Sequence, residues 1–421
     1  MLSIWEVLLV PLADVQSTLL DATAPLGPTR VRLREALGYV LAATAIAPEN
    51  VPSFDNSAMD GYALRAGDVE MRPAELEVIG TIAAGQISDL TVGLGQAARI
   101  MTGAPIPDGA DAVVMVEQTE TSADRSRVAV LAPVKRGDHV RPAGSDLHKG
   151  AVVLDPGLTL GPSHLGLLAS VGEDQPEVFR RPVVGVLSTG DELVDPASPL
   201  RQGQIWDSNR VALLACLERD RFVPVDLGIV VDDYRAVRER IESALGDCDA
   251  LLTSGGVSAG DFDHVKRVVN ELAAIHGGVS ESIGLAIRPA KPFAYAFLPS
   301  SANRPTPVLG LPGNPVSSLV SYELLARPVL RRLAGHAEAL RPETVGRAAE
   351  DFARHSDGKT HFIRVVVAPG SDGVLEARSA GGQGSHQLSA MAGANALAIL
   401  PDGKGGIRAG EPLSLLVLEH P

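Results

Sequence analysis

Between Arg181 and about Gly335, short apolar runs alternate with segments of helical periodicity. The pattern predicts strands at 182–187, 222–230, 249–253 and 307–311, and helices at 209–220, 234–245, 265–272 and 315–324. Such alternation predicts parallel strands, because parallel neighbours need a long crossover that is usually a helix. We therefore expect a doubly wound α/β domain over 181–335, with its ligand at the carboxyl ends of the strands.

One strand end in this region leads into a glycine-rich loop. Leu251-Leu-Thr-Ser254 is followed by Gly255-Gly-Val-Ser-Ala-Gly260 and then by Asp261-Phe-Asp263 at the start of the next helix. Glycine lets the backbone approach a ligand closely, and the free N–H groups of a helix start attract an anion. Two carboxylates beside an anion suggest a divalent cation between them. The same residues also fit a tight strand-to-helix connection that Asp261 caps.

Polar loops follow two further strands of the predicted sheet. Ser188-Thr-Gly-Asp-Glu192 comes after the first strand, and Leu311-Pro-Gly-Asn-Pro-Val-Ser317 after the last. We expect Asn314 to be the N-cap of the following helix and Pro315 its first residue. In one parallel sheet these loops would line a single crevice, although neither a P-loop nor a dinucleotide fingerprint is present. The candidate binding residues are Ser188, Thr189, Gly190, Ser254, Gly255, Gly256, Ser258, Pro312, Gly313 and Asn314.

Charged residues gather near the same loops. The acids are Asp191, Glu192, Asp232, Asp261 and Asp263. Oxygen ligands of this kind suit Mg²⁺, which binds through one or two carboxylates plus phosphate oxygens. Capping of helices by Asp191 and Asp232 is the alternative. Arg288-Pro-Ala-Lys291 presents two cations on a proline-stiffened segment, and ordinary surface charge is the alternative there.

The remaining chain predicts three other parts. Residues 48–146 alternate like strands, after a polar, irregular stretch at 51–63. Residues 1–47, with their clearest helix at 31–37, and residues 147–180 are predicted to be helical. They would form one linker domain into which the mainly β domain is inserted. Short apolar runs separated by Gly and Asp turns at 336–421 predict a small C-terminal β-barrel.

Composition narrows the classes of function. The net charge of −14 argues against nucleic acid or an anionic membrane as a partner. Cys216 and Cys248 have no Cys or His at metal-ligand spacing, so we expect buried reduced thiols and a cytoplasmic location. The apolar N-terminus is interrupted by Glu6, Pro11 and Asp14, well before it reaches the length of a membrane span.

Taken together, these loops resemble the molybdopterin molybdenumtransferases, a family that includes bacterial MoeA proteins and the E domain of gephyrin. The resemblance covers much of the chain but not its C-terminal domain, and the matching stretches follow the family's order. They are Phe54-Asp-Asn-Ser-Ala-Met-Asp-Gly-Tyr-Ala63, Arg99-Ile-Met-Thr-Gly-Ala-Pro-Ile-Pro107, Ser188-Thr-Gly-Asp-Glu-Leu193, Ser254-Gly-Gly-Val-Ser-Ala-Gly-Asp261, Lys291-Pro-Phe293 and Leu311-Pro-Gly-Asn-Pro-Val-Ser317.

The resemblance implies an elongated homodimer of four-part subunits, with the β domain at 48–146 reaching the crevice of the other subunit. It implies a reaction in which adenylylated molybdopterin and molybdate react with the help of Mg²⁺, the metal enters the dithiolene and AMP leaves. By motif position it places functional residues at Asp60, Thr102, Glu192, Asp232, Asp263, Arg288 and Lys291. Asp232 and Asp263 are the expected Mg²⁺ ligands.

This sequence departs from the family pattern at two positions. Ala290 replaces the glycine of the usual Pro-Gly-Lys-Pro, and Gly284 stands where a basic residue is common. Arg364, in the C-terminal domain, is a further candidate for the same pocket. Two other functions remain open from the sequence: a non-catalytic dimeric scaffold of the same fold, and another pterin or nucleotide enzyme such as an adenylyltransferase. The acids at 60, 192, 232 and 263 argue against the scaffold.

Overall fold

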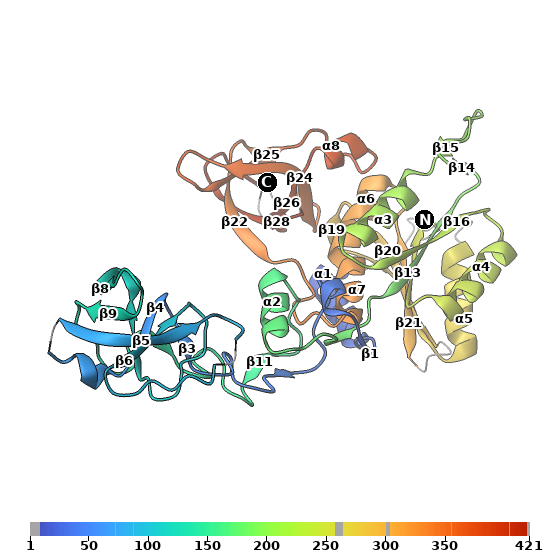
Figure 1. The fold of residues 1–421 in the computed structure, drawn as a ribbon. Helices are drawn as coiled ribbons and strands as arrows, with labels where there is room; N and C mark the ends of the chain where they lie inside the picture. The colour runs from blue at the N-terminus through green and yellow to red at the C-terminus, as the bar shows by residue number, and fades with distance from the viewer. Residues whose placement is uncertain are drawn as a thin grey trace, which may run out of the picture.

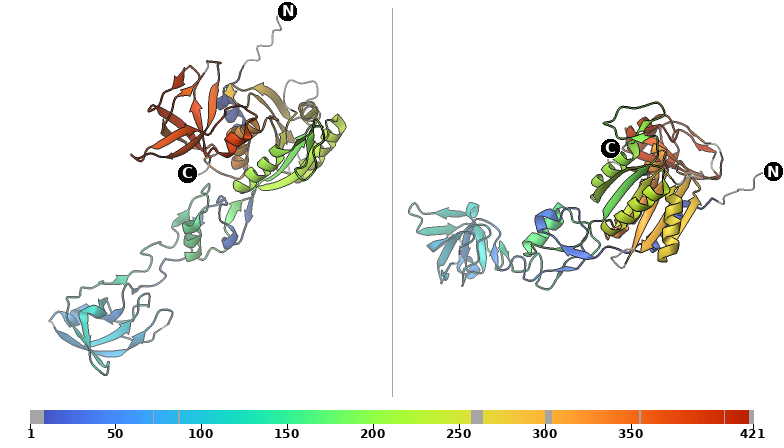
Figure 2. Two further views of the ribbon diagram at one scale, coloured as in Figure 1. Left: turned by 90° about the horizontal axis from the view of Figure 1, so that it is seen from above. Right: turned by 90° about the vertical axis from the view of Figure 1, so that its right-hand side faces the viewer.

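The computed structural model describes residues 9–71, 73–86, 88–256, 264–299, 304–354, 356–403 and 405–418. The chain is elongated (Figures 1 and 2). A β domain lies at one end, a narrow linker follows, and the α/β and C-terminal domains lie together at the other end. Within the described residues, no helix has both the length and the apolar character needed to cross a membrane.

The α/β domain is built on a six-stranded sheet. Its order is β16 (Val223–Val230), β13 (Val183–Thr189), β17 (Ala250–Ser254), β21 (Pro305–Leu311), β20 (Pro292–Pro299) and β18 (Val279–Gly284). The first four strands are parallel, as the alternation in the sequence predicts. The last two are antiparallel and extend one edge.

Helices cover both faces of this sheet, so the predicted doubly wound class is confirmed. On one face α3 (Ser208–Arg219) and α6 (Pro315–Ser321) pack in the same apolar cluster as Val184, Val186 and Leu252. On the other face α4 (Tyr234–Asp247) and α5 (His264–His276) pack around Leu187 and Leu251. The last helix continues beyond α6 through a π-helical turn, Tyr322–Ala326, into α7 (Arg327–Leu333).

The linker is less helical than its sequence suggests. It contains α1 (Leu12–Asp21), β1 (Pro28–Arg30), the 3-10 helix η1 (Leu33–Glu35), β2 (Ala45–Ile46), β11 (Val152–Leu154), α2 (Pro162–Ser170) and β12 (Glu177–Phe179). The helix expected over 31–37 is wrong, since only the single 3-10 turn forms there. β1 pairs with β12 and β2 with β11, so the two halves of the linker meet. These pairings support the domain boundaries that we propose at residues 47, 146 and 180, and the proposed boundary at 335 is independent of them.

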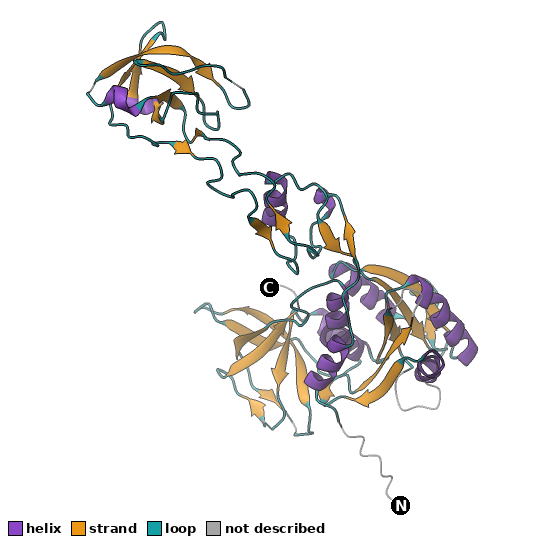
Figure 3. Cartoon of the chain, turned by 90° about the horizontal axis from the view of Figure 1, so that it is seen from below, coloured by secondary structure: helices purple, strands orange, loops and turns teal. Residues whose placement is uncertain are grey.

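The inserted domain is built almost entirely from strands and loops (Figure 3). Its main sheet has the order β7 (Ala112–Met115), β4 (Gly61–Leu64), β6 (Gln96–Ile100), β5 (Ala74–Ile82), β9 (Arg127–Val130) and β8 (Thr119–Thr121). β3 (Asn56–Ser57) pairs with β10 (Val140–Arg141), and η2 (Ala66–Val69) and η3 (Val116–Gln118) are short 3-10 turns.

The C-terminal domain is the small β-barrel that its sequence predicts. Its sheet runs β19 (Ile287–Arg288), β24 (Thr360–Pro369), β25 (Leu375–Ser379), β22 (Glu343–Ala348), β28 (Pro412–Val417) and β26 (Ala396–Leu400), and pairing of β24 with β26 closes it. β23 (Phe352–Ala353) pairs with β27 (Gly406–Ile407), and α8 (Leu388–Ala392) is one short helix. Because β19 comes from the α/β domain, this pairing joins the two domains.

Candidate active site

A cavity of about 530 Å³ lies at the carboxyl ends of β13, β17 and β21, where the three predicted loops meet. The loops therefore do line one crevice. Predicted residues that line it are Thr189, Gly190, Glu192, Asp232, Ser254, Gly255, Gly256, Gly313 and Asn314. Ser188 and Pro312 are buried beside it. Ser258 and Asp263, together with Asp261, lie outside the described residues.

The glycine loop has a backbone that other residues rarely adopt. Gly255 and Gly256 both have positive φ, +93° and +69°. A Cβ at Gly256 would also stand 2.7 Å from Cγ2 of Val265, the second residue of α5. Glycine is therefore required twice over at position 256, for its backbone conformation and for its close packing on the helix. Gly255 and Gly256 line the cavity without side chains.

Asn209 connects the loops, although sequence reasoning missed it. Its side-chain amide donates to Oγ of Ser254 at 2.8 Å and to the carbonyl of Gly313 at 2.7 Å. It lies in the first turn of α3, two residues after the N-cap Asp207, whose carboxylate accepts from the N–H of Arg210. The sequence signal was a second polar residue just inside a capped helix that follows a strand end.

Asn314 occupies the N-cap position of α6, but the expected side-chain cap does not form. Pro315 stands in the first turn as predicted. The Asn314 side chain is exposed and lines the cavity instead. Asn314, which the sequence predicts as a helix cap, is thus available to a ligand.

The neighbouring acids Asp232 and Asp233 have different roles. Asp233 caps α4, accepting from the N–H of Ala236 at 2.9 Å, whereas Asp232 faces the cavity. The N–H of Asp232 donates to Oδ1 of Asp191 at 3.0 Å. Partial burial, and then the nearby carboxylates of Asp191 and Glu192, raise the pKa of Asp232.

This group of acids fits a divalent cation. A carboxylate whose pKa is raised by neighbouring carboxylates is stabilised by a positive ion beside it. Within the described residues, no three His, Cys, Asp or Glu side chains are placed to hold a metal ion by themselves. A pair of carboxylates that leaves the remaining positions to water and phosphate suits Mg²⁺ better than a closed protein cage.

A second cavity of about 290 Å³ adjoins the first and shares Asn314 with it. Arg288 and Lys291 line it, so the predicted cations do lie next to the strand-end loops. Lys359 and Ser385 come from the C-terminal domain, and were not predicted. β19 pairs with β24 through Arg288 and His361, which brings this face of the barrel to the cations. Short-range sequence patterns carry no signal for such a contact.

Arg364 is almost completely buried, with 1% of its surface exposed. It donates to the carbonyls of Gly382 and Gly384 and lines a further cavity of about 170 Å³ together with Arg288. Burial lowers its pKa. Arg364 therefore lies near Arg288, but it is not among the described residues that line the strand-end cavity or the adjoining cavity of Lys291.

Ala290 has a left-handed backbone, with φ at +74°. Glycine adopts this conformation freely, whereas a residue with a Cβ loses about 1 kcal/mol in it. The glycine that is usual at this position in the resembling family therefore has a conformational explanation. Gly284 ends β18 and is buried.

Asp60 and Thr102 lie together, but in the inserted β domain. Oδ1 of Asp60 accepts from the N–H of Thr102 at 2.7 Å and from its hydroxyl at 2.8 Å. These two bonds, and more weakly the charge of Arg99, lower the pKa of Asp60. Within one chain this domain is at the opposite end from the strand-end cavity (Figure 1), so the chain does not unite the two groups.

Models of known protein families match successive parts of the chain. They are the MoeA N-terminal region (domain I and II) at residues 10–172, a probable molybdopterin binding domain at 185–332, and the MoeA C-terminal region (domain IV) at 346–418. The molybdopterin molybdenumtransferase of Haemophilus influenzae is 37% identical over 93% of this chain and 94% of its own. The molybdopterin molybdenumtransferase of a Nostoc species is 40% identical over 93% of this chain and 88% of its own. The chain belongs to the molybdopterin molybdenumtransferase family.

Solved structures agree with this assignment. A molybdopterin biosynthesis MoeA protein from Pyrococcus horikoshii superimposes with a TM-score of 0.81, at 30% identity, and covers 98% of this chain and 100% of its own. The predicted family and fold class are therefore confirmed, and the chain is a member of a transferase family. The family name carries no residue roles by itself, so those rest on the geometry above.

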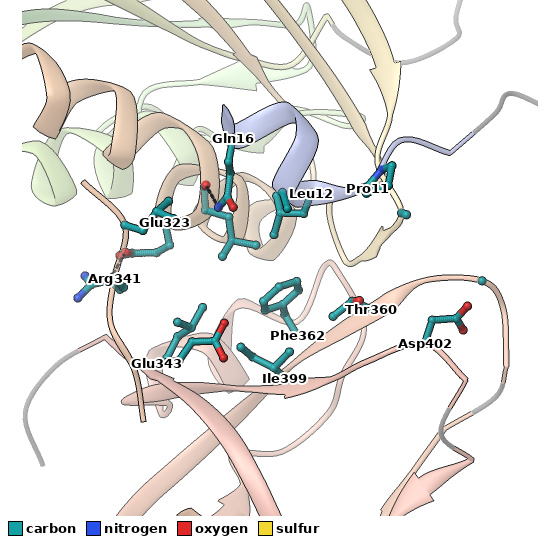
Figure 4. A pocket seen from close by; sticks show the side chains of 16 residues that line it. Pro11, Leu12, Gln16, Glu323, Arg341, Glu343, Thr360, Phe362, Ile399 and Asp402 are labelled. Carbon is teal, nitrogen blue, oxygen red and sulfur yellow. Dashed lines mark hydrogen bonds and ion pairs between the residues drawn. The ribbon is translucent and has the colours of Figure 1, made fainter. Parts of the chain in front are cut away.

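A fourth cavity, of about 510 Å³, lies between α1 and the C-terminal barrel (Figure 4). Among its described lining residues there is no candidate site residue predicted from the sequence. Leu12, Phe362 and Ile399 form an apolar interior, and Glu323 binds Arg341 at 2.6 Å on its rim. In this molybdenumtransferase family member, it is a junction between domains rather than a collection of reactive groups.

Proposed function

We propose that the chain inserts molybdenum from molybdate into adenylylated molybdopterin and releases AMP. The observation that carries this proposal is the strand-end cavity, which combines anion-accepting glycine loops, a cluster of acids and an adjoining pair of cations. A phosphoanhydride beside an oxyanion is strongly negative, so its reaction needs positive groups that are already in place. The adjoining cavity supplies the positive groups, Arg288 and Lys291, and the strand-end cavity supplies carboxylates for a metal ion.

The roles of the predicted residues follow from their positions. Thr189, Gly255, Gly256 and Gly313 would receive the phosphate groups through the narrow loops. Arg288 and Lys291 would neutralise the anionic end of the substrate in the adjoining cavity. Glu192, with Asp232, would orient the phosphate oxygens through the cation.

The metal that fits the acids is Mg²⁺. Asp232, with Asp191 or Glu192 beside it, would hold the ion, and Asp263 remains a proposed ligand outside the described residues. When bound, Mg²⁺ would supply charge neutralisation at the phosphate oxygens. The chain's own contribution is to gather carboxylates whose mutual repulsion is relieved by the ion.

We also propose that the protein works as a homodimer in the cytoplasm, with its active site shared between subunits. Asp60 and Thr102 form an ordered pair at the far end of the chain, where the same subunit has no strand-end cavity. In a twofold dimer each β domain would reach its partner's cavity. Thr102 holds the carboxylate of Asp60 ionised, so that it can accept a hydrogen bond from an attacking water.

The direct test supplies the purified chain with adenylylated molybdopterin, molybdate and Mg²⁺, and measures AMP and the completed cofactor. Release of AMP together with cofactor formation is expected. A folded dimer that yields neither would favour the non-catalytic scaffold. A protein that releases AMP without molybdate-dependent cofactor formation would instead be a nucleotide hydrolase.

A mixing experiment tests the shared site. Asp60→Ala and Lys291→Ala variants are each expected to be inactive but folded. If each site uses residues from both subunits, mixed dimers contain one intact site, and activity should return to about a quarter of wild type. No recovery after subunit exchange, verified with differently tagged chains, would place both residues in one subunit's site.

A further inference from the structure

Trp206 is a large aromatic side chain that the fold leaves half uncovered at the strand-end cavity. Half of its surface is exposed, and it lines the cavity with Thr189, Gly255 and Asn314. Of the described residues around this cavity, it offers the largest aromatic surface. None of the roles proposed above uses it. An exposed indole inside a pocket of phosphate-type loops is apolar surface that a ligand can cover.

The position of Trp206 is held from both sides. Its strand, β15 (Ile205–Trp206), pairs with β14 (Leu193–Val194), and the N–H of the next residue, Asp207, donates to the Val194 carbonyl at 2.9 Å. Asp207 is buried and caps α3. The arm that carries these strands projects from the edge of the α/β domain in Figure 1.

The indole itself is also anchored. Its Nε1–H donates to the carbonyl of Ser198 at 2.9 Å, across the loop of the same arm. The single polar atom of the side chain is therefore satisfied by the protein. What remains for a ligand is the ring, which makes a surface for stacking rather than for hydrogen bonding. A ring held in advance loses little conformational entropy when a ligand binds.

We propose that Trp206 is the stacking platform for a flat heteroaromatic ring of the ligand whose phosphate groups occupy the glycine loops. The nature of that ligand rests on the function proposed above, which supplies two such rings, the pterin and the adenine. Asn209, three residues along and in the first turn of α3, reaches the loops of Ser254 and Gly313. One short segment thus connects the ring platform to the phosphate end of the cavity.

Fluorescence gives a direct readout, because Trp5 and Trp206 are the only tryptophans in the sequence. In a Trp5→Phe background, the emission of the full-length protein reports Trp206 alone. Titration with pterin-6-carboxylate and, separately, with AMP should quench it saturably for at least one of the two. The compound that quenches identifies the ring. Absence of quenching by both compounds overturns the proposal.

Substitutions separate stacking from simple burial. Trp206→Phe keeps an aromatic face, so its dissociation constant for the quenching compound should lie within about threefold of the wild-type value. Trp206→Leu keeps only apolar bulk, and its dissociation constant should be about tenfold higher than that of wild type. The matched control is Leu200→Ala, which removes exposed apolar surface from the same arm but does not line the cavity. It should bind like wild type. Equal losses for Phe and Leu, or equal losses for Leu200→Ala, contradict a stacking role.

Kinetics distinguishes this inference from the proposed function. In AMP release, Trp206→Leu should raise KM about tenfold and change kcat less than twofold, because the ring positions substrate without touching reacting atoms. If wild type releases no AMP but is still quenched saturably, the proposed function fails and the platform stands. If Trp206→Leu leaves both KM and the thermal unfolding midpoint unchanged, Trp206 has no role in binding substrate.

Discussion

The backbone N–H and the hydroxyl of Thr102 donate to the same oxygen of Asp60, at 2.7 and 2.8 Å. Both bonds favour the ionised carboxylate and lower its pKa. The pair is exposed to solvent at the end of an elongated chain. A charged, oriented and uncovered carboxylate is suited to a ligand or to the surface of a partner subunit.

Thr102→Val should move the acid limb of the activity profile to higher pH. It removes the hydroxyl bond and keeps the backbone bond, which is the larger cause of the lowered pKa, so the shift is partial. Thr102→Ser keeps the hydroxyl and is the control. The pH dependence of kcat/KM for AMP release, with an NMR titration of the Asp60 carboxyl, measures the change. Identical acid limbs in the two variants would contradict this role.

Asp232→Asn and Asp233→Ala should affect different properties. Asn at 232 removes an acid whose pKa is raised in the fold, so the Mg²⁺ concentration for half-maximal activity should rise about tenfold while stability stays level or increases. In the wild type, the raised pKa means that Mg²⁺ affinity falls on acidification before an ordinary aspartate would protonate.

The adjacent control uses the capping acid. Asp233→Ala removes the cap of α4 and should cost about 1 kcal/mol of unfolding free energy, with no change in Mg²⁺ dependence. Chemical unfolding and Mg²⁺ titration on the same preparations separate the two effects. Reversed results would exchange the roles of the two residues.

Two alanine substitutions in the loops test the cavity against the fold. A Cβ at Gly313 would meet only Cα of Gly255, at 3.8 Å, so Gly313→Ala should fold normally and raise KM by intruding on the substrate. Gly256→Ala should instead destabilise by about 1–2 kcal/mol, because its φ is +69° and its Cβ would stand 2.7 Å from Val265. Denaturant midpoints and KM values check both. Loss of stability in Gly313→Ala would show that this loop is structural.

His336 should make the fold sensitive to acid. Burial, followed by the charges of Arg331 and Arg327, lowers the pKa of His336 to about 4, and Thr159 shares a 3.1 Å hydrogen bond with it. The buried ring is neutral. The contribution of His336 to the free energy of unfolding is therefore fully present above the ordinary histidine pKa, and it is lost as pH falls from about 6.5 to about 4. At pH 5 the linked loss is about 2 kcal/mol.

His336→Gln removes the titrating group, and each protein is compared with itself at two pH values. The difference in unfolding free energy between pH 7.5 and pH 5 should be smaller in the variant than in the wild type by about that 2 kcal/mol. Urea unfolding at both pH values, followed by circular dichroism, measures it. An unchanged difference would mean that other groups cause the acid sensitivity.

Local periodicity predicts the four parallel strands of the α/β domain and their helices well, but not its two antiparallel strands, β20 and β18. β13, β17 and β21 and the helices after them lie within a few residues of their predicted ranges, because each has a regular apolar pattern and clear end signals. The linker is different. Residues 31–37 have helical spacing but form only a short 3-10 turn, since the nearby chain pairs as β1 with β12 and β2 with β11.

The sequence by itself determined the family, the parallel sheet and the loops that meet at its edge, because motifs and periodicity are local. It also placed Arg288 and Lys291 on a segment near that edge. Only the tertiary structure decided which of Asp232 and Asp233 caps α4, and that Asn209 joins Ser254 to Gly313. It alone brought Lys359 and Ser385 to the cations, since contacts between residues far apart in the chain depend on how whole elements pack.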